Sequence, residues 1–281
     1  MAQDKWLIQP GESRIIDVEL VRALKVAVIG GQIDIIGHDE PGARVEVHSV
    51  SGRDLKITVD GDRLEIDHPQ LRWDNFIDVF KSMRSNGKAD VSVLVPREVA
   101  LKFGIVSASA LISGLKTDAK LSTVSGDLVV DGLVGNLELN SVSGEISVRD
   151  HTGNISAHTV SGDVTATGAI GKFGLDGISG NVMVDIAGTP DAISSNTVSG
   201  DLTVRIPDAL GARYHVNTVS GKMQLDNAFI SGSPGRTQTG TAGSLNGSWV
   251  DINVNSVSGN VAVLRSVTPA DATSGQNGAS A

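Results

Sequence analysis

A four-residue motif that returns along the chain constrains the fold more than any other feature of this sequence. The motif is Val or Ile, then Ser, Gly and a polar residue, and its copies begin at Val124, Val142, Val160, Ile178, Val198, Val219 and Val257. The first four copies lie 18 residues apart, and the later steps are 20, 21 and 38 residues. A degenerate copy begins at Val106, where Ala108 replaces the glycine. Self-similarity at a fixed period is typical of repeat proteins, in which each unit stacks on its neighbour.

Each repeat divides into two halves that begin at a glycine. Glycine returns every nine residues at Gly126, Gly135, Gly144, Gly153, Gly162, Gly171 and Gly180. Apolar residues stand two and four positions after each of them, with polar residues between. This alternation is the signature of a half-buried strand. The sequence therefore predicts an all-β fold: a right-handed parallel β-helix or β-solenoid with 18-residue coils, its handedness taken from the general preference of parallel crossovers.

The motif itself predicts a structural ladder at one corner of the coil. Stacked serines could bond neighbouring backbone groups, and the glycines after them could adopt positive φ. The aliphatic residues that open each copy should stack as an apolar ladder. The predicted ladder positions are Ser125, Gly126, Ser143, Gly144, Ser161, Gly162, Ser179, Gly180, Ser199, Gly200, Ser220, Gly221, Ser258 and Gly259.

These units resemble the bacterial putative-adhesin family, a domain of unknown function with β-strand repeats of the T-V-S-G-D-V type. The resemblance is carried by Thr123–Leu128, Thr159–Val164 and Thr197–Leu202, and by two strands that end in Val-Pro or Ile-Pro, at Val95–Val99 and Ile206–Leu210. It covers residues 11–267. It implies a β-helix-like fold and, for some members, an association with cell-envelope stress loci. It brings no catalytic residues, so none are assigned.

The chain divides into an N-terminal extension (1–10), an N-terminal β section (11–100), the solenoid repeats (101–267) and a disordered tail (268–281). For residues 227–256 the sequence leaves a loop and an irregular coil both open. Strands in the N-terminal section are expected at Arg14–Leu20, Leu24–Ile29, Gln32–Ile36, Arg44–Val50, Leu55–Val59 and Leu64–Ile66.

An insertion at residues 70–90 differs from the rest, because its apolar residues recur at helical spacing. One interpretation is a short helical lid folded onto the solenoid. The other is an exposed helix that contacts a partner or a membrane surface through Trp73, Phe76 and Phe80.

The composition limits the classes of partner that this protein could bind. The net charge is −9 and no basic stripe is present, which argues against nucleic acid. There is no cysteine, and no apolar run is long enough for an integral membrane segment. We expect no cofactor and no metal, a protein partner or self-association, and a cytoplasmic location, with attachment to the inner face of the membrane through a partner.

The residues that could carry chemistry also have simpler uses. Asp127, Glu145 and Asp163 recur in one slot and could form a carboxylate strip, but solvated charges beside a glycine corner are the ordinary use. His151 and His158 lack a third zinc ligand. The serines occupy equivalent slots, which marks them as structural.

We therefore predict no enzyme, but a non-catalytic β-solenoid scaffold or interaction module linked to the bacterial cell envelope or stress response. The alternative is a self-assembling, bactofilin-like filament protein. A carbohydrate-active solenoid enzyme is a distant third.

Overall fold

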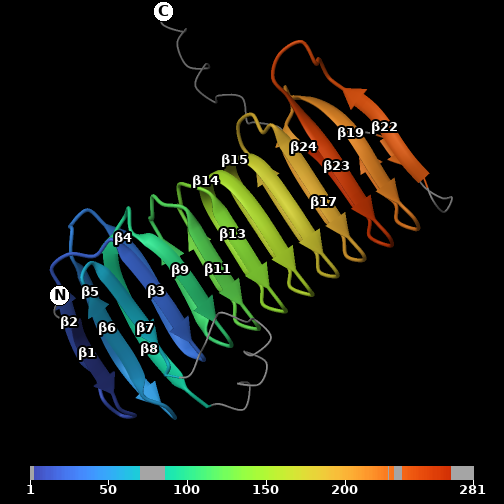
Figure 1. The fold of residues 1–281 in the computed structure, drawn as a ribbon. Helices are drawn as coiled ribbons and strands as arrows, with labels where there is room; N and C mark the ends of the chain where they lie inside the picture. The colour runs from blue at the N-terminus through green and yellow to red at the C-terminus, as the bar shows by residue number, and fades with distance from the viewer. Residues whose placement is uncertain (1–2, 70–85, 227, 231–235, 267–281) are drawn as a thin grey trace, which may run out of the picture.

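The computed structural model describes residues 3–69, 86–226, 228–230 and 236–266, and within them the chain forms 24 strands and no helix. The strands are stacked side by side into a long all-β, solenoid-like body (Figure 1). Their hydrogen bonds follow two ladders. Two long strands, β14 (Ile146–Thr159) and β15 (Val164–Gly177), take part in both ladders and so join them.

The first ladder runs in this spatial order: β1 (Gln3–Ile8), β6 (Leu55–Asp60), β7 (Arg63–Asp67), β3 (Ala23–Val28), β9 (Ala100–Ile105), β11 (Ala119–Thr123), β13 (Leu137–Ser141), β14, β15, β17 (Ala192–Thr197), β23 (Trp249–Ser256), β19 (Gly211–Thr218) and β22 (Arg236–Ala242).

The second ladder runs in this order: β2 (Arg14–Val18), β5 (Ala43–Ser51), β8 (Lys88–Pro96), β4 (Gly31–His38), β10 (Ser109–Ser113), β12 (Leu128–Asp131), β14, β15, β16 (Val182–Ile186), β18 (Leu202–Pro207), β24 (Val261–Ser266), β20 (Met223–Leu225) and β21 (Ala228–Ile230).

Pairing in the middle of both ladders is parallel and joins equivalent residues of successive repeats. Leu128, Ile146, Val164 and Val182 follow one another in the second ladder at steps of 18 residues. The apolar positions of the alternating pattern lie in one continuous core, and these four side chains are 1–3% exposed. Period-two alternation therefore places one face of these parallel strands in the interior.

Both ends depart from simple sequential stacking. At the C-terminal end, β23 and β24 insert between the coil of β17 and β18 and the coil of β19 and β20. At the N-terminal end, β3 and β4 lie in the same way between β7 and β8 on one side and β9 and β10 on the other. Antiparallel strands then close the stack, namely β6, β1, β5 and β2 at one end and β22 and β21 at the other.

Within the range 227–256, the described residues 228–230 and 236–256 form neither a simple loop nor an irregular coil. The chain leaves the terminal coil, adds the antiparallel strands β21 and β22, and returns as the regular coil of β23 and β24. The step of 38 residues between Gly221 and Gly259 measures this return, since the glycine that stacks on Gly221 is Gly259.

The N-terminal section follows the prediction closely, since all six expected strands are present within one or two residues of their expected ends. Residues 3–8, expected to be an extension, form β1. The predicted insertion ends early, because residues 88–90 belong to β8. Residues 70–85, with the predicted helix and Trp73, Phe76 and Phe80, lie outside the described residues, as does the tail 268–281.

The glycines at the motif corner are required mainly by close backbone approach. A Cβ on Gly126, Gly144 or Gly162 would lie 1.7, 2.1 and 2.2 Å from the carbonyl oxygen of the residue 18 positions earlier. These three do not have positive φ, whereas Gly180 and Gly200 have φ of 124° and 109°. The predicted backbone reason thus applies to the last two, and steric contact with the coil below applies to all five.

Candidate functional site

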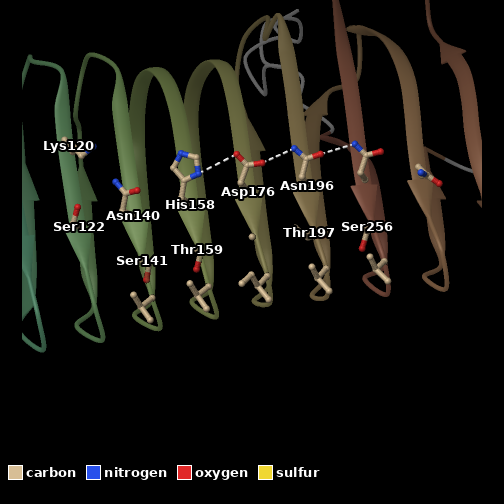
Figure 2. A pocket seen from close by; sticks show the side chains of 18 of the residues that line it. Lys120, Ser122, Asn140, Ser141, His158, Thr159, Asp176, Asn196, Thr197 and Ser256 are labelled. Carbon is tan, nitrogen blue, oxygen red and sulfur yellow. Dashed lines mark hydrogen bonds and ion pairs between the residues drawn. The ribbon is translucent and has the colours of Figure 1, made fainter. Parts of the chain in front are cut away.

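A groove with a volume of 1160 Å³ runs across the outer face of the first ladder, parallel to the solenoid axis. Residues from β9, β11 and each later strand of the ladder as far as β19 line it, together with the corner residues that follow these strands. Figure 2 shows its polar side chains above the corner turns. Two rows of side chains define this groove, which we take as the candidate site.

The first row, called here the aliphatic row, comes from the residues that open the repeated motif. In spatial order its members are Val160, Ile178, Val198, Val257 and Val219, and they are 44, 54, 49, 48 and 47% exposed. The predicted apolar ladder therefore exists, but on the outside of the solenoid. Earlier members of the same stack differ, because Val106 and Val124 are only 3 and 2% exposed and form a small separate cluster.

The sequence contained a signal for this outward placement. Counting in steps of two from the buried Ala157 puts Thr159 inward and Val160 outward. The structure agrees, since Thr159 is 6% exposed and Val160 is 44% exposed. The sequence predicted an apolar ladder, and from Val160 onward the alternation places this ladder in solvent.

The second row, called here the polar row, lies next to the aliphatic row and consists of Asn140, His158, Asp176, Asn196, Asn255 and Asn217. Four of its members, from His158 to Asn255, are linked along the axis (Figure 2). Asn196 donates from Nδ2 to Asp176 Oδ1 at 2.9 Å, and Asn255 donates to Asn196 Oδ1 at 2.9 Å. His158 Nδ1 lies 3.5 Å from Asp176 Oδ2. Each amide keeps further hydrogen-bonding capacity for a bound molecule.

Positive charge gathers at the N-terminal end of the groove. Lys102 and Lys120 line this end. Lys120 pairs with Glu138, and the hydrogen bond from this lysine is the main reason why the pKa of Glu138 is lowered. Lys102 makes no ion pair within the part of the chain that the structure describes. The groove is thus neutral to slightly basic on a protein of net charge −9.

The serines of the predicted structural ladder are used in backbone bonds. Each hydroxyl donates to the carbonyl of the aliphatic residue in the neighbouring coil, as Ser143 does to Val124 at 3.0 Å and Ser161 to Val142 at 3.0 Å. The same contact occurs at Ser107, Ser125, Ser179, Ser199, Ser220 and Ser258.

Most of these corners also contain a buried threonine or serine hydroxyl, three residues before the motif glycine, for which the sequence predicted no role. Thr123 Oγ1 donates to the Gly126 carbonyl at 2.7 Å and accepts the Gly126 N–H at 3.0 Å. Thr159 makes both bonds to Gly162 in the same way. The threonine of the T-V-S-G unit therefore pins the turn from inside, which explains why a polar residue occupies an inward position.

Carboxylates of the suspected strip, like the serines, form hydrogen bonds with the backbone. Asp163 Oδ1 accepts the N–H of Asn181 at 2.6 Å, and Asp201 Oδ1 accepts that of Asn260 at 3.0 Å. Asp127 accepts the N–H of Glu145 at 3.3 Å. These side chains satisfy a backbone donor of the next coil at the corner, where the parallel ladder is interrupted. No group of three or more potential metal ligands occurs among the described residues.

The two buried histidines lie away from the groove. His68 is fully buried, accepts the Ile29 N–H at its Nδ1, and has its pKa lowered to about 4, first by burial and then by the charge of Arg53. His151 is also fully buried, and burial lowers its pKa. His158, by contrast, belongs to the polar row. The structure does not bring His151 and His158 into one site.

Two stacked β ladders wound as successive coils place this molecule among all-β, solenoid-like proteins. The chain belongs to the Toastrack DUF4097 family, whose model matches residues 21–264. This match confirms the resemblance found in the motifs. No curated protein matches the chain.

Several solved structures are similar to this chain, including the following three. A putative cell adhesion protein from Clostridium sporogenes is 16% identical, with 94% of this chain and 100% of that one covered and a TM-score of 0.29. A putative lipid binding protein from Parabacteroides distasonis is 13% identical, with 92 and 99% covered and a TM-score of 0.49. A putative adhesin from the same organism is 14% identical, with 91 and 99% covered and a TM-score of 0.45. Within the described part of the chain, no helix has the length and apolar character needed to cross a bilayer.

Proposed function

We propose that this protein is a non-catalytic β-solenoid interaction module that binds its partner along the groove of the first ladder. The observation that carries the proposal is the aliphatic row, whose five members are each 44–54% exposed in consecutive coils. Scattered exposed apolar residues are ordinary, but a contiguous row beside a polar row marks an interaction surface.

The chemistry of the groove supports binding without catalysis. Catalysis by a serine requires a hydroxyl that is bonded to a base, and the corner serines instead donate to backbone carbonyls. The carboxylates that a carbohydrate-active enzyme would use accept backbone N–H groups. His158 faces Asp176 within a row of amides. The family, a domain of unknown function, assigns no activity that would oppose this proposal.

The filament alternative has less support. Growth by coil-on-coil addition needs a parallel coil exposed at each end. Antiparallel strands stand there instead, with β1 and β2 at one end and β22 and β21 at the other. We therefore favour lateral binding through the groove.

Three further parts of the proposal rest on the sequence. They are a right-handed winding with 18-residue coils, a role in the cell envelope or stress response, and a cytoplasmic location at the inner face of the membrane through a partner.

The test compares one groove variant with one matched surface variant. Ile178→Asp places a carboxylate in the aliphatic row, and Val134→Asp places one at an exposed corner (44% exposed) that does not line the groove. Each chain is expressed in its native host, cross-linked in cells, and its captured proteins are identified by mass spectrometry. We expect proteins that the wild type and Val134→Asp capture and Ile178→Asp loses. Equal capture by all three chains would refute the groove as the binding surface.

A further inference from the structure

We infer that the aliphatic row along the groove packs against the same row of a second copy of this chain, in a twofold dimer whose axis passes beside Val198. The inference rests on the proposed function, because it names the occupant of the same groove. It is carried by the spacing, symmetry, charge and length of the two rows.

Spacing favours an identical row as the occupant. Neighbouring strands are about 4.8 Å apart, so the five members of the aliphatic row span about 19 Å. A bound helix repeats every 5.4 Å and would drift by about 2 Å over this distance. An extended peptide repeats its side chains every 6.6–6.8 Å or so and would lose step within two coils. Two copies of the same row keep the same spacing over their whole length.

Twofold symmetry gives a consistent set of partners. With the two rows antiparallel, Val198 meets Val198 of the second copy, Ile178 meets Val257, and Val160 meets Val219. Every contact then pairs aliphatic side chains of similar size. Such an interface is isologous and closes at two copies.

Charge in the polar row agrees with this arrangement. The same antiparallel register places Asp176 opposite Asn255, and His158 opposite Asn217. Asn196, whose amide can both donate and accept, meets its own copy at the axis. No two like charges of this row face each other, and the remaining amide donors and acceptors of one copy can bond those of the other.

The row also has a defined length. On the N-terminal side its stack continues into the half-buried Val142 and the buried Val124. On the other side Val219 belongs to the last parallel coil, beyond which β22 and β21 close the stack. Five residues and their polar neighbours form a small patch compared with about 800 Å² per partner in a standard interface, so the dimer should be weak. We expect a dissociation constant in the micromolar range.

The test uses the absence of cysteine from this chain. In purified Val198→Cys the two thiols meet at the axis, so mild oxidation should give a disulfide-linked dimer in high yield. Val134→Cys, exposed to a similar extent but outside the groove, is the control and should remain largely monomeric. Equal cross-linking of the two variants would overturn the inference.

Sedimentation velocity measures the same association without a cross-link. The wild-type chain should shift from monomer to dimer between about 1 and 300 μM, and Ile178→Asp should raise the dissociation constant by about tenfold or more because it buries a carboxylate against an apolar row. A wild type that stays monomeric throughout, or a monomer that retains an amphiphile in native mass spectrometry, would overturn the second copy as occupant. If the chain does not dimerise but Ile178→Asp still loses captured proteins in cells, the proposed function survives without the dimer. If the chain does not dimerise and Ile178→Asp captures the same proteins as the wild type, the proposed function and the dimer are both refuted.

Discussion

Replacing Gly144 by alanine tests the physical reason for the glycine in the repeated motif. The new Cβ would lie 2.1 Å from the carbonyl oxygen of Gly126 and 3.0 Å from its carbonyl carbon. Real Cβ contacts are essentially never below 3.0 Å, so the two coils must separate locally by about 1 Å. Gly144 is not in the positive-φ region, so no backbone strain contributes.

The expected cost follows from this separation. Overpacking of a close-packed site costs about 1–3 kcal/mol. The displacement also weakens flanking bonds between coils, including Ser143 N–H to the Val124 carbonyl and Leu128 N–H to the Glu145 carbonyl, both 2.9 Å long, at about 1 kcal/mol each. We therefore expect Gly144→Ala to lower the free energy of unfolding by about 3–5 kcal/mol.

Two other glycines separate the contact from the conformation. Gly132 has φ of 64° and nothing within 4 Å of an added Cβ, so alanine there should cost about 1 kcal/mol. Gly247 has neither positive φ nor a near neighbour, and alanine there should change stability by less than about 0.5 kcal/mol. Alanine reduces the entropy of the unfolded chain in all three variants, so this effect cancels in the comparison.

Urea unfolding followed by far-ultraviolet circular dichroism gives the three free energies. The order should be Gly144→Ala, then Gly132→Ala, then Gly247→Ala, from most to least destabilised. If Gly144→Ala is no less stable than Gly132→Ala, close contact between coils is not the reason for the motif glycine.

Three further predictions concern other parts of the fold. His68, whose pKa is lowered from 6.5 to about 4, is neutral when folded, so the unfolded chain takes up a proton first as the pH falls from 6.5 to 4. The free energy of unfolding should fall by about 3 kcal/mol over this range. Urea unfolding at each pH should show a shallower fall for His68→Gln than for the wild type. Equal slopes would contradict a lowered pKa of His68. Gly177 occupies the inward slot that holds Thr or Ser in other coils, and an added Cβ would meet only ordinary contacts at 3.4–3.7 Å, so Gly177→Thr should raise the midpoint of urea unfolding by an amount equivalent to about 1 kcal/mol. A lower midpoint would show that the inward position at Gly177 has no room for a threonine side chain. Arg265 is half-buried and bonds Asp226 at 2.6 Å, so Arg265→Ala should cost about 3 kcal/mol in the same assay, against less than about 1 kcal/mol for Arg205→Ala at an exposed pair. Equal losses would show that burial of the Asp226 pair is unimportant.

The candidate site shows where reasoning from sequence was sufficient and where it stopped. Alternation in the repeats identified the strands and the buried positions, because the side of a strand on which a residue lies is a local property with period two. The same rule, carried on past Ala157, would have placed Val160 outside. The predicted apolar ladder was not assigned to the inside or the outside, since a residue type alone does not reveal which side of a strand faces solvent.

The roles of the motif glycines and of the carboxylates after them could not be predicted without the neighbouring coils. Positive φ was the expected reason for glycine, but at Gly126 and Gly144 the reason is a carbonyl oxygen of a residue 18 positions away. Asp163 was expected to be a solvated charge beside the corner, yet it accepts an N–H from the next coil. Both facts depend on the distance between stacked turns, which the composition of a single turn does not contain.

The sequence by itself determined that this chain forms strands and that equivalent residues recur at one corner. Tertiary structure alone decided the order of the coils. Every repeat presents similar strand edges, so many stackings satisfy the local pattern, and only long-range pairing inserts β23 between β17 and β19. Tertiary structure also decided that one exposed row is formed by Val160, Ile178, Val198, Val257 and Val219. In this row Val257 precedes Val219, the reverse of their order along the chain, because β23 lies between β17 and β19.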